Sequence, residues 1–131
     1  MVSASTVSQE VLDAFTQLKG NNLKYLIAVN PEGTNDVNLA STGDNDKTFD
    51  DFKADLPEDD ARFAVYNLAW THSDGRKLTK LVFINYVPDG CKKMAIKFQY
   101  ANLKDSVKSS FNPINKEMQI NDRLDLDEAE W

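Results

Sequence analysis

Only two side chains in this sequence are obvious candidates for nucleophilic or metal chemistry, His72 and Cys91, and each is the only residue of its type. A Ser-His-Asp or Cys-His site would have to include His72, and a zinc site would need more ligands than Cys91 has near it. His72 precedes the turn sequence Ser73-Asp74-Gly75, so we interpret it as a solvated turn residue. A small hydrolase that uses His72 or Cys91 is one hypothesis, and it predicts turnover that His72→Ala abolishes.

Other catalytic patterns are missing as well. Neither the phosphate-binding pattern GxxxxGK(S/T) nor the dinucleotide-binding pattern GxGxxG occurs. The carboxylate groups of Asp50-Asp51 and Glu58-Asp59-Asp60 fall in polar segments, where no burial would raise a pKa toward neutrality. We therefore expect a protein that is not an enzyme and that needs no cofactor or metal.

Basic residues with helical spacing form the most informative pattern. Lys97, Ala101, Lys104 and Lys108 are four, three and four residues apart, so in a helix they share one stripe. A second stripe with the same period is apolar and consists of Tyr100, Leu103, Val107 and Phe111. The apolar stripe can dock on a sheet while the basic one faces outward. This spacing fits a binding face for an acidic partner, and it also fits a core helix with ordinary solvated lysines.

The region around these lysines is positively charged, although the chain as a whole is negative. The chain of 131 residues has a net charge of −6, which argues against a dedicated nucleic-acid binder. Residues 76–108 nevertheless hold eight basic and two acidic residues, a local charge of +6 against −12 elsewhere. A positive patch on an acidic protein can steer an acidic partner to one face. A solvated basic face without a partner is the alternative.

The elements that must position this helix follow from apolar periodicity. Helices are predicted from the N-cap Ser8 to Gly20, over 46–56, over 93–111 and from Leu126 onward. Strands are predicted over 25–29, 37–40, 63–70, 78–87 and 118–120, with a hairpin turn at 73–75. We expect a single α+β domain over 1–131, with a central mixed sheet of about five strands and helices on both faces.

No sequence signal directs the chain out of the cytosol. The N-terminus lacks a charged and then apolar signal region. No apolar run approaches the roughly 18 residues of a membrane span, and one cysteine cannot form an internal disulfide. We expect a monomer in the cytoplasm without a transmembrane segment.

A combination of segments spans nearly the whole chain. It consists of Ser3 followed by Val7-Ser8, FDDF (49–52), LPEDDARFAVY (56–66), KLVFINYVPD (80–89) and KFQYANLKD (97–105). In order and spacing this combination resembles the actin-depolymerising factor homology domain of the actin-depolymerising factor/cofilin family. The resemblance implies a cytoskeletal protein that binds actin monomers and filaments and promotes filament depolymerisation and turnover.

Carried over by position, the resemblance implies two binding faces. The monomer-binding face is expected to comprise Lys97, Lys104, Asp105 and Lys108, with the segment from Ser3 to Thr6 beside it. The filament-binding face is expected to include Arg76, Lys77 and Lys80. Ser3 matches the family's inhibitory phosphorylation position, although Ala4 replaces the usual glycine. The basic face is also expected to bind phosphoinositides in competition with actin.

Three departures from the family pattern predict weak severing. Ala95 takes a position that is often basic, Ser109-Ser110 replace further basic residues, and the sequence stops at Trp131, about one turn into the last helix. A glia-maturation-factor-like protein, which binds the actin-related branching complex, is the alternative, because residues 72–76 and 90–92 resemble that group. Lys97 and the serine-bearing N-terminal extension favour cofilin.

Overall fold

The computed structural model describes residues 6–31, 33–34, 36–57, 59–71, 73–91, 93–111 and 114–121. These residues form one six-stranded sheet in the order β1-β3-β2-β4-β5-β6. The strands are β1 (Thr6–Val7), β2 (Tyr25–Val29), β3 (Asp36–Gly43), β4 (Arg62–Thr71), β5 (Lys77–Tyr86) and β6 (Lys116–Ile120). The central pairs are antiparallel, whereas β1 joins β3 and β6 joins β5 in parallel. The sheet is therefore mixed, as predicted.

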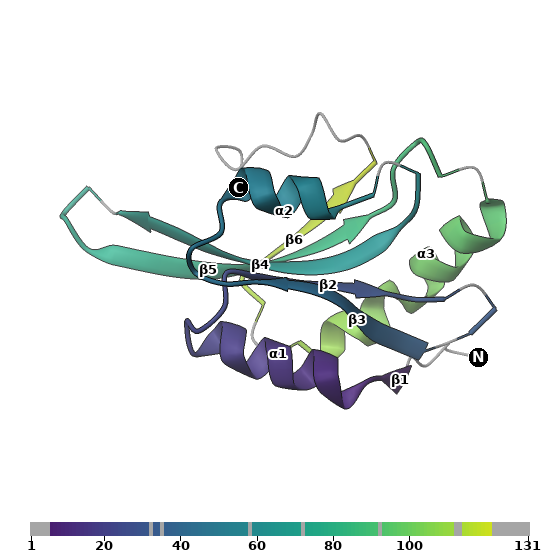
Figure 1. Cartoon of the computed structure of the whole chain (residues 1–131), viewed down its shortest axis with the longest axis horizontal. Helices are drawn as coiled ribbons and strands as arrows, with labels where there is room; N and C mark the ends of the chain where they lie inside the picture. The colour runs from purple at the N-terminus through teal and green to yellow at the C-terminus, as the bar shows by residue number, and fades with distance from the viewer. Residues whose placement is uncertain are drawn as a thin grey trace.

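Three helices cover the two faces of the sheet. Helices α1 (Gln9–Lys19) and α3 (Met94–Ser109) lie on one face and α2 (Phe49–Asp55) lies on the other (Figure 1). Ser8 caps α1 by accepting a hydrogen bond from the Val11 amide. Thr48 and Asp51 form a reciprocal capping box at the start of α2. The predicted helices on both faces are confirmed.

Alternation along the central strands produces a separate apolar cluster on each face. In β5, Leu81 and Phe83 belong to the cluster under α1 and α3, whereas Val82 and Ile84 belong to the cluster under α2. Successive side chains of a strand point to opposite faces, so one strand supplies both cores. The α2 side is rich in aromatic rings, with Phe52 and Tyr66 at a centroid distance of 5.0 Å.

Boundaries differ from the predicted ones where a cap or a long-range pairing decides them. Helix α2 begins at Phe49 instead of residue 46, because the capping box fixes its first turn. Helix α3 ends at Ser109, and the buried Phe111 lies just beyond it. The sheet has six strands instead of about five, since the two residues of β1 pair with β3. The predicted helix from Leu126 lies outside the described residues.

The hairpin of β4 and β5 is the longest feature of the sheet. Its two strands pair from Arg62 with Tyr86 to Thr71 with Lys77. β2 pairs with β4 only as far as Tyr66, and β6 pairs with β5 only from Val82 onward. The tip of the hairpin therefore extends past its neighbouring strands, as Figure 1 shows.

Candidate functional site

Helix α3 packs on the sheet through the predicted apolar stripe. Tyr100, Leu103 and Val107 are each at most 1% exposed, and Ile96 extends the stripe toward the N-terminal end of the helix. The Tyr100 ring lies 4.6 Å from the Phe63 ring, centroid to centroid. The docking half of the two-stripe prediction is thus confirmed, and the opposite side of α3 faces outward.

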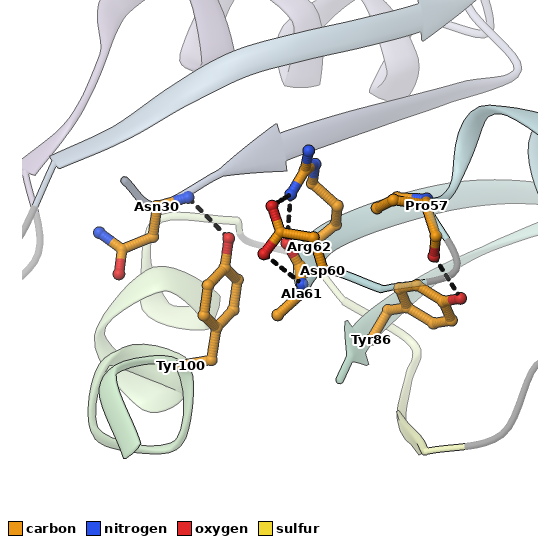
Figure 2. A network of polar contacts seen from close by, with 7 residues as sticks. All are labelled: Asn30, Pro57, Asp60, Ala61, Arg62, Tyr86 and Tyr100. Atoms are coloured by element: carbon orange, nitrogen blue, oxygen red, sulfur yellow. Dashed lines mark hydrogen bonds and ion pairs between the residues drawn. The ribbon is translucent and has the colours of Figure 1, made fainter. Parts of the chain in front are cut away.

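Polar contacts fix α3 to the end of β2. The Tyr100 hydroxyl accepts a hydrogen bond from the Asn30 amide at 2.8 Å, as Figure 2 shows. Burial raises the pKa of Tyr100 to about 12, so the hydroxyl stays protonated beyond the pH at which an exposed tyrosine ionises. The neighbouring Gln99 side chain donates to the Pro31 carbonyl at 2.7 Å and accepts from the Gly33 amide at 3.0 Å. These contacts hold the helix at one height above the sheet.

The same end of the structure is braced by the segment that leads into β4. Asp60 accepts hydrogen bonds from the Ala61 amide at 2.9 Å and from the Arg62 guanidinium at 2.7 Å (Figure 2). The Tyr86 hydroxyl donates to the Pro57 carbonyl at 2.7 Å. The two Asp60 contacts fix the start of β4, and the Tyr86 contact ties the end of β5 to the segment that follows α2.

The outward side of α3 carries two large apolar side chains, Met94 and Phe98. They are 59% and 63% exposed, and among the described residues they are the exposed large hydrophobic side chains. The two are four residues apart, so they lie one above the other, and the small exposed Ala101 continues their side of the helix. Neither Met94 nor Phe98 is among the site residues predicted from the sequence. The sequence did contain a signal for Phe98, because this residue does not share the apolar stripe of Tyr100 and Val107 and should therefore not face the sheet with them.

The predicted lysines border this apolar side, and two of them are paired. Lys104 and Lys108 lie 3.5 Å and 2.6 Å from the carboxylate oxygens of Glu117 on β6. The hydrogen bond from Lys108, with the nearby charge of Lys104, holds the pKa of Glu117 below its usual range. Lys97 is half-buried beside them, and Asp105 is exposed. The structure thus brings Lys97, Lys104, Asp105 and Lys108 together on one helix and adds an internal counter-ion.

The residues predicted for the second face lie on the β4–β5 hairpin. Arg76 is exposed at its turn and donates to Asp74 from Nε at 2.7 Å. Lys80 lies on the protruding part of β5, opposite Leu68 of β4. Lys77 opens β5, where it pairs with Thr71. The hairpin residues and the α3 residues therefore form two separate groups.

The nucleophile hypothesis receives no support from the described residues. Cys91 is 2% exposed, and its backbone amide donates to the Pro88 carbonyl at 2.9 Å. The described residues contain no group of three His, Cys, Asp or Glu side chains placed to hold a metal ion. His72, Ser3 and the Ser3–Ser5 part of the N-terminal segment lie outside the described residues.

No helix within the described ranges combines the length and apolar character needed to cross a membrane.

Comparison with known proteins identifies the family. The family described as cofilin/tropomyosin-type actin-binding protein matches residues 4–131. The chain belongs to the actin-depolymerising factor/cofilin family. This family consists of actin-binding proteins and not of enzymes, so the expectation of a non-enzymatic protein is confirmed. Among curated relatives of this cofilin-family chain, the cofilin of Mycosarcoma maydis is 35% identical over 93% of this chain and 87% of its own length.

Solved structures agree with this assignment. The crystal structure of Streptomyces griseoflavus cofilin superposes with a TM-score of 0.83 at 32% identity, covering 97% of this chain and 95% of that one. The solution structure of glia maturation factor from Caenorhabditis elegans gives a TM-score of 0.76 at 19% identity, covering 96% and 91%. The second likeness concerns the fold alone. The cofilin-family resemblance and fold expected from the sequence are confirmed.

Proposed function

We propose that this protein binds actin monomers through the outward side of α3 and actin filaments through the β4–β5 hairpin, and so promotes filament depolymerisation and turnover. It acts in the cytoplasm, on the actin cytoskeleton, as a monomer. Family membership supports actin as the partner, and the two groups of residues described above support two contact faces.

The exposed pair Met94 and Phe98 is the observation that carries the proposal. Burying an apolar side chain of this size against a partner contributes about 1.5–3 kcal/mol. Aromatic residues and Met are also enriched in the apolar core of protein interfaces, which a polar rim surrounds. Lys97, Lys104 and Lys108 lie along one border of the pair, where they add attraction for an acidic surface.

Weak severing follows from the charge that α3 lacks. Ala95 and Ser109 are both exposed and contribute no positive charge at the two ends of the helix. On the hairpin, Arg76 is already paired with Asp74, and such an exposed pair reduces the attraction available to a filament. We expect binding that shifts filaments toward monomers more than it breaks them. The basic border of α3 is also expected to bind phosphoinositides in competition with actin.

Two parallel measurements test the proposal: titration of fluorescently labelled actin monomer, and co-sedimentation with filaments. The double variant Lys97→Ala, Lys104→Ala is expected to bind monomer more than tenfold more weakly. A charge-assisted hydrogen bond contributes about 1.5–3 kcal/mol, and release of Lys104 from Glu117 offsets only part of that.

The matched control is Lys19→Ala with Lys47→Ala, which removes the same charge from exposed sites outside α3 and the hairpin. The control should bind like the parent protein. Equal affinity of both double variants would reject the α3 face. Binding of the parent to the actin-related branching complex but not to actin would favour the glia-maturation-factor-like alternative.

A further inference from the structure

Gln99 connects α3 to the turn between β2 and β3 through three hydrogen bonds. Its Nε2 donates to the Asn30 side-chain oxygen and to the Pro31 carbonyl, and its Oε1 accepts from the Gly33 amide. The bonded residues are 66 to 69 positions apart in the sequence, so the connection is long-range. Both N–H groups and the oxygen of the Gln99 amide are therefore engaged by the turn.

Asn30 extends this connection across the turn. The residue is 1% exposed, and its Nδ2 donates to the Thr34 carbonyl at 3.1 Å and to the Asp36 carbonyl at 2.6 Å. Its backbone amide donates to the Tyr100 hydroxyl at 2.8 Å (Figure 2). Asn30 therefore joins both sides of the turn to two consecutive residues of α3.

Asp36 is also the residue at which the start of the chain meets the sheet. Thr6 of β1 pairs with Asp36 and Val7 pairs with Val37. The Ser8 amide, at the beginning of α1, donates to the Val37 carbonyl at 2.9 Å. A strand of two residues is shorter than most strands, so its position depends on the strand that it pairs with. The backbone that receives β1 is thus the backbone that Asn30 holds.

We propose that Gln99 is a positioning residue, which acts through Asn30 and Asp36 to hold β1, and with it the point where the N-terminal segment enters the fold, in a fixed place relative to α3. The buried stripe of α3 fixes the helix on the sheet, so the helix is the rigid end of this connection. The inference rests on the proposed function, because the outward side of α3 is the proposed actin-binding face. Gln99 keeps the start of the chain in register with that face without contacting actin itself.

Amide hydrogen exchange of the intact protein, followed by nuclear magnetic resonance, tests the connection. Gln99→Leu keeps a good helix former at this position but removes all three hydrogen bonds. The Gly33 and Ser8 amides should then exchange about tenfold faster, the factor expected for a net loss of one or two hydrogen bonds. The Lys24 amide should keep its rate, because its bond to the Gly43 carbonyl lies at the opposite end of the β2–β3 pair.

Matched variants separate this role from a general loss of stability. Asn102→Leu removes an amide from an exposed position of the same helix and should leave Ser8 exchange unchanged. Gly33 and Gly75 both have a left-handed backbone, with φ of +81° and +93°, and a Cβ at either position would meet no atom within 4 Å. Gly33→Ala therefore strains only the backbone of its turn. It should also speed exchange at Ser8, whereas Gly75→Ala in the β4–β5 turn should not.

Titration of labelled actin monomer measures whether binding uses the connection. Gln99→Leu and Gly33→Ala should each bind monomer several-fold more weakly than the parent protein, because the N-terminal segment then enters the fold from a loosened β1. The two substitutions act from opposite ends of the same hydrogen bond, so an equal direction of effect points to the connection between them.

Three results would overturn the proposal. Ser8 exchange that is unchanged in Gln99→Leu would show that no connection reaches β1. Equal acceleration at Ser8 and Lys24 would show a general loss of stability, and parental monomer affinity in both variants would show that binding does not use the connection. Failure of the proposed function is distinguishable, because the parent protein would then not bind actin while Ser8 exchange still depended on Gln99.

Discussion

Replacing Glu117 by Gln removes the carboxylate that holds Lys104 and Lys108 on the side of β6. Glutamine keeps the length of the side chain and still accepts a hydrogen bond, so the change acts mainly on charge. Both lysine side chains are about a third exposed, at 33% and 39%, and they stay on the solvent-facing part of α3. The substitution therefore frees two positive charges without moving the helix, and we expect it to strengthen binding of an acidic partner.

The size of this effect follows from the two ion pairs. Partly exposed pairs of this kind are worth about 0.2–1 kcal/mol each, and a partner that takes both lysines must replace them. A partner carboxylate roughly 6 Å from Glu117 would also be repelled by about 0.7 kcal/mol in water-like surroundings. Part of the total is lost because Gln still bonds to a lysine. We expect actin-monomer affinity to rise about threefold to tenfold at low salt, or roughly 0.7–1.4 kcal/mol.

Titration of labelled monomer at two ionic strengths checks this prediction. At about 0.01 M the screening length is about 30 Å, and at about 0.15 M it is about 8 Å, so the gain should shrink in the second buffer. Asp46→Asn is the matched control, since it changes the net charge equally from an exposed loop before α2. Affinity that is unchanged or weaker for Glu117→Gln at low salt would refute the reasoning, because Glu117 would then position the lysines instead of withholding them.

Three further predictions concern other parts of the chain. Phe98→Ala should weaken monomer binding by about tenfold or more and leave the melting temperature unchanged, because its exposed ring contributes to the partner contact and not to the core. Calorimetry gives the melting temperature and the monomer titration gives the affinity. A lower melting temperature with normal affinity would contradict this prediction. Ser3→Glu, which imitates a phosphorylated Ser3, should bind actin monomer several-fold more weakly than Ser3→Ala, and Ser3→Ala should match the parent. The reason is that a phosphate adds a charge of about −1.5 to −2 beside a face proposed to meet an acidic partner. Equal affinities of all three proteins would exclude regulation by phosphorylation of Ser3. The free energy of unfolding should fall as the pH rises above 10, because the tyrosine loses its proton near 10.0 in the unfolded chain and only near 12 in the fold. Denaturant titrations at a series of pH values should show a shallower decline for Tyr100→Phe. If the free energy of unfolding falls as steeply with pH in that variant as in the parent, Tyr100 is not the source of the decline.

Local pattern was sufficient for most of the fold. The 3.6-residue period that joins Tyr100, Leu103 and Val107 depends only on the helix itself, and these three residues are buried as predicted. The long strands on either side of the turn at 73–75 were likewise predictable from composition. β1 was not, since two residues give no period, and their pairing with Asp36 and Val37 is a long-range contact.

The site was predictable in outline but not in its contacts. Helical spacing placed Lys97, Lys104 and Lys108 on one side of α3. The ion pairs with Glu117 depend on β6 returning in parallel beside β5, which no local pattern specifies. Apolar residues are normally assigned to a core, and for that reason the exposed Phe98 escaped notice.

Cys91 lies buried in the loop that carries the chain from β5 into α3, and its burial has a practical use. A thiol reagent attacks only an accessible thiolate, so it can react here only when the loop opens. The rate of labelling then reports how often the loop that leads into α3 opens. The chain has a single thiol, so the signal arises from one place without any engineered tag. A native side chain thus offers a direct measure of local opening beside α3, the helix proposed to contact actin.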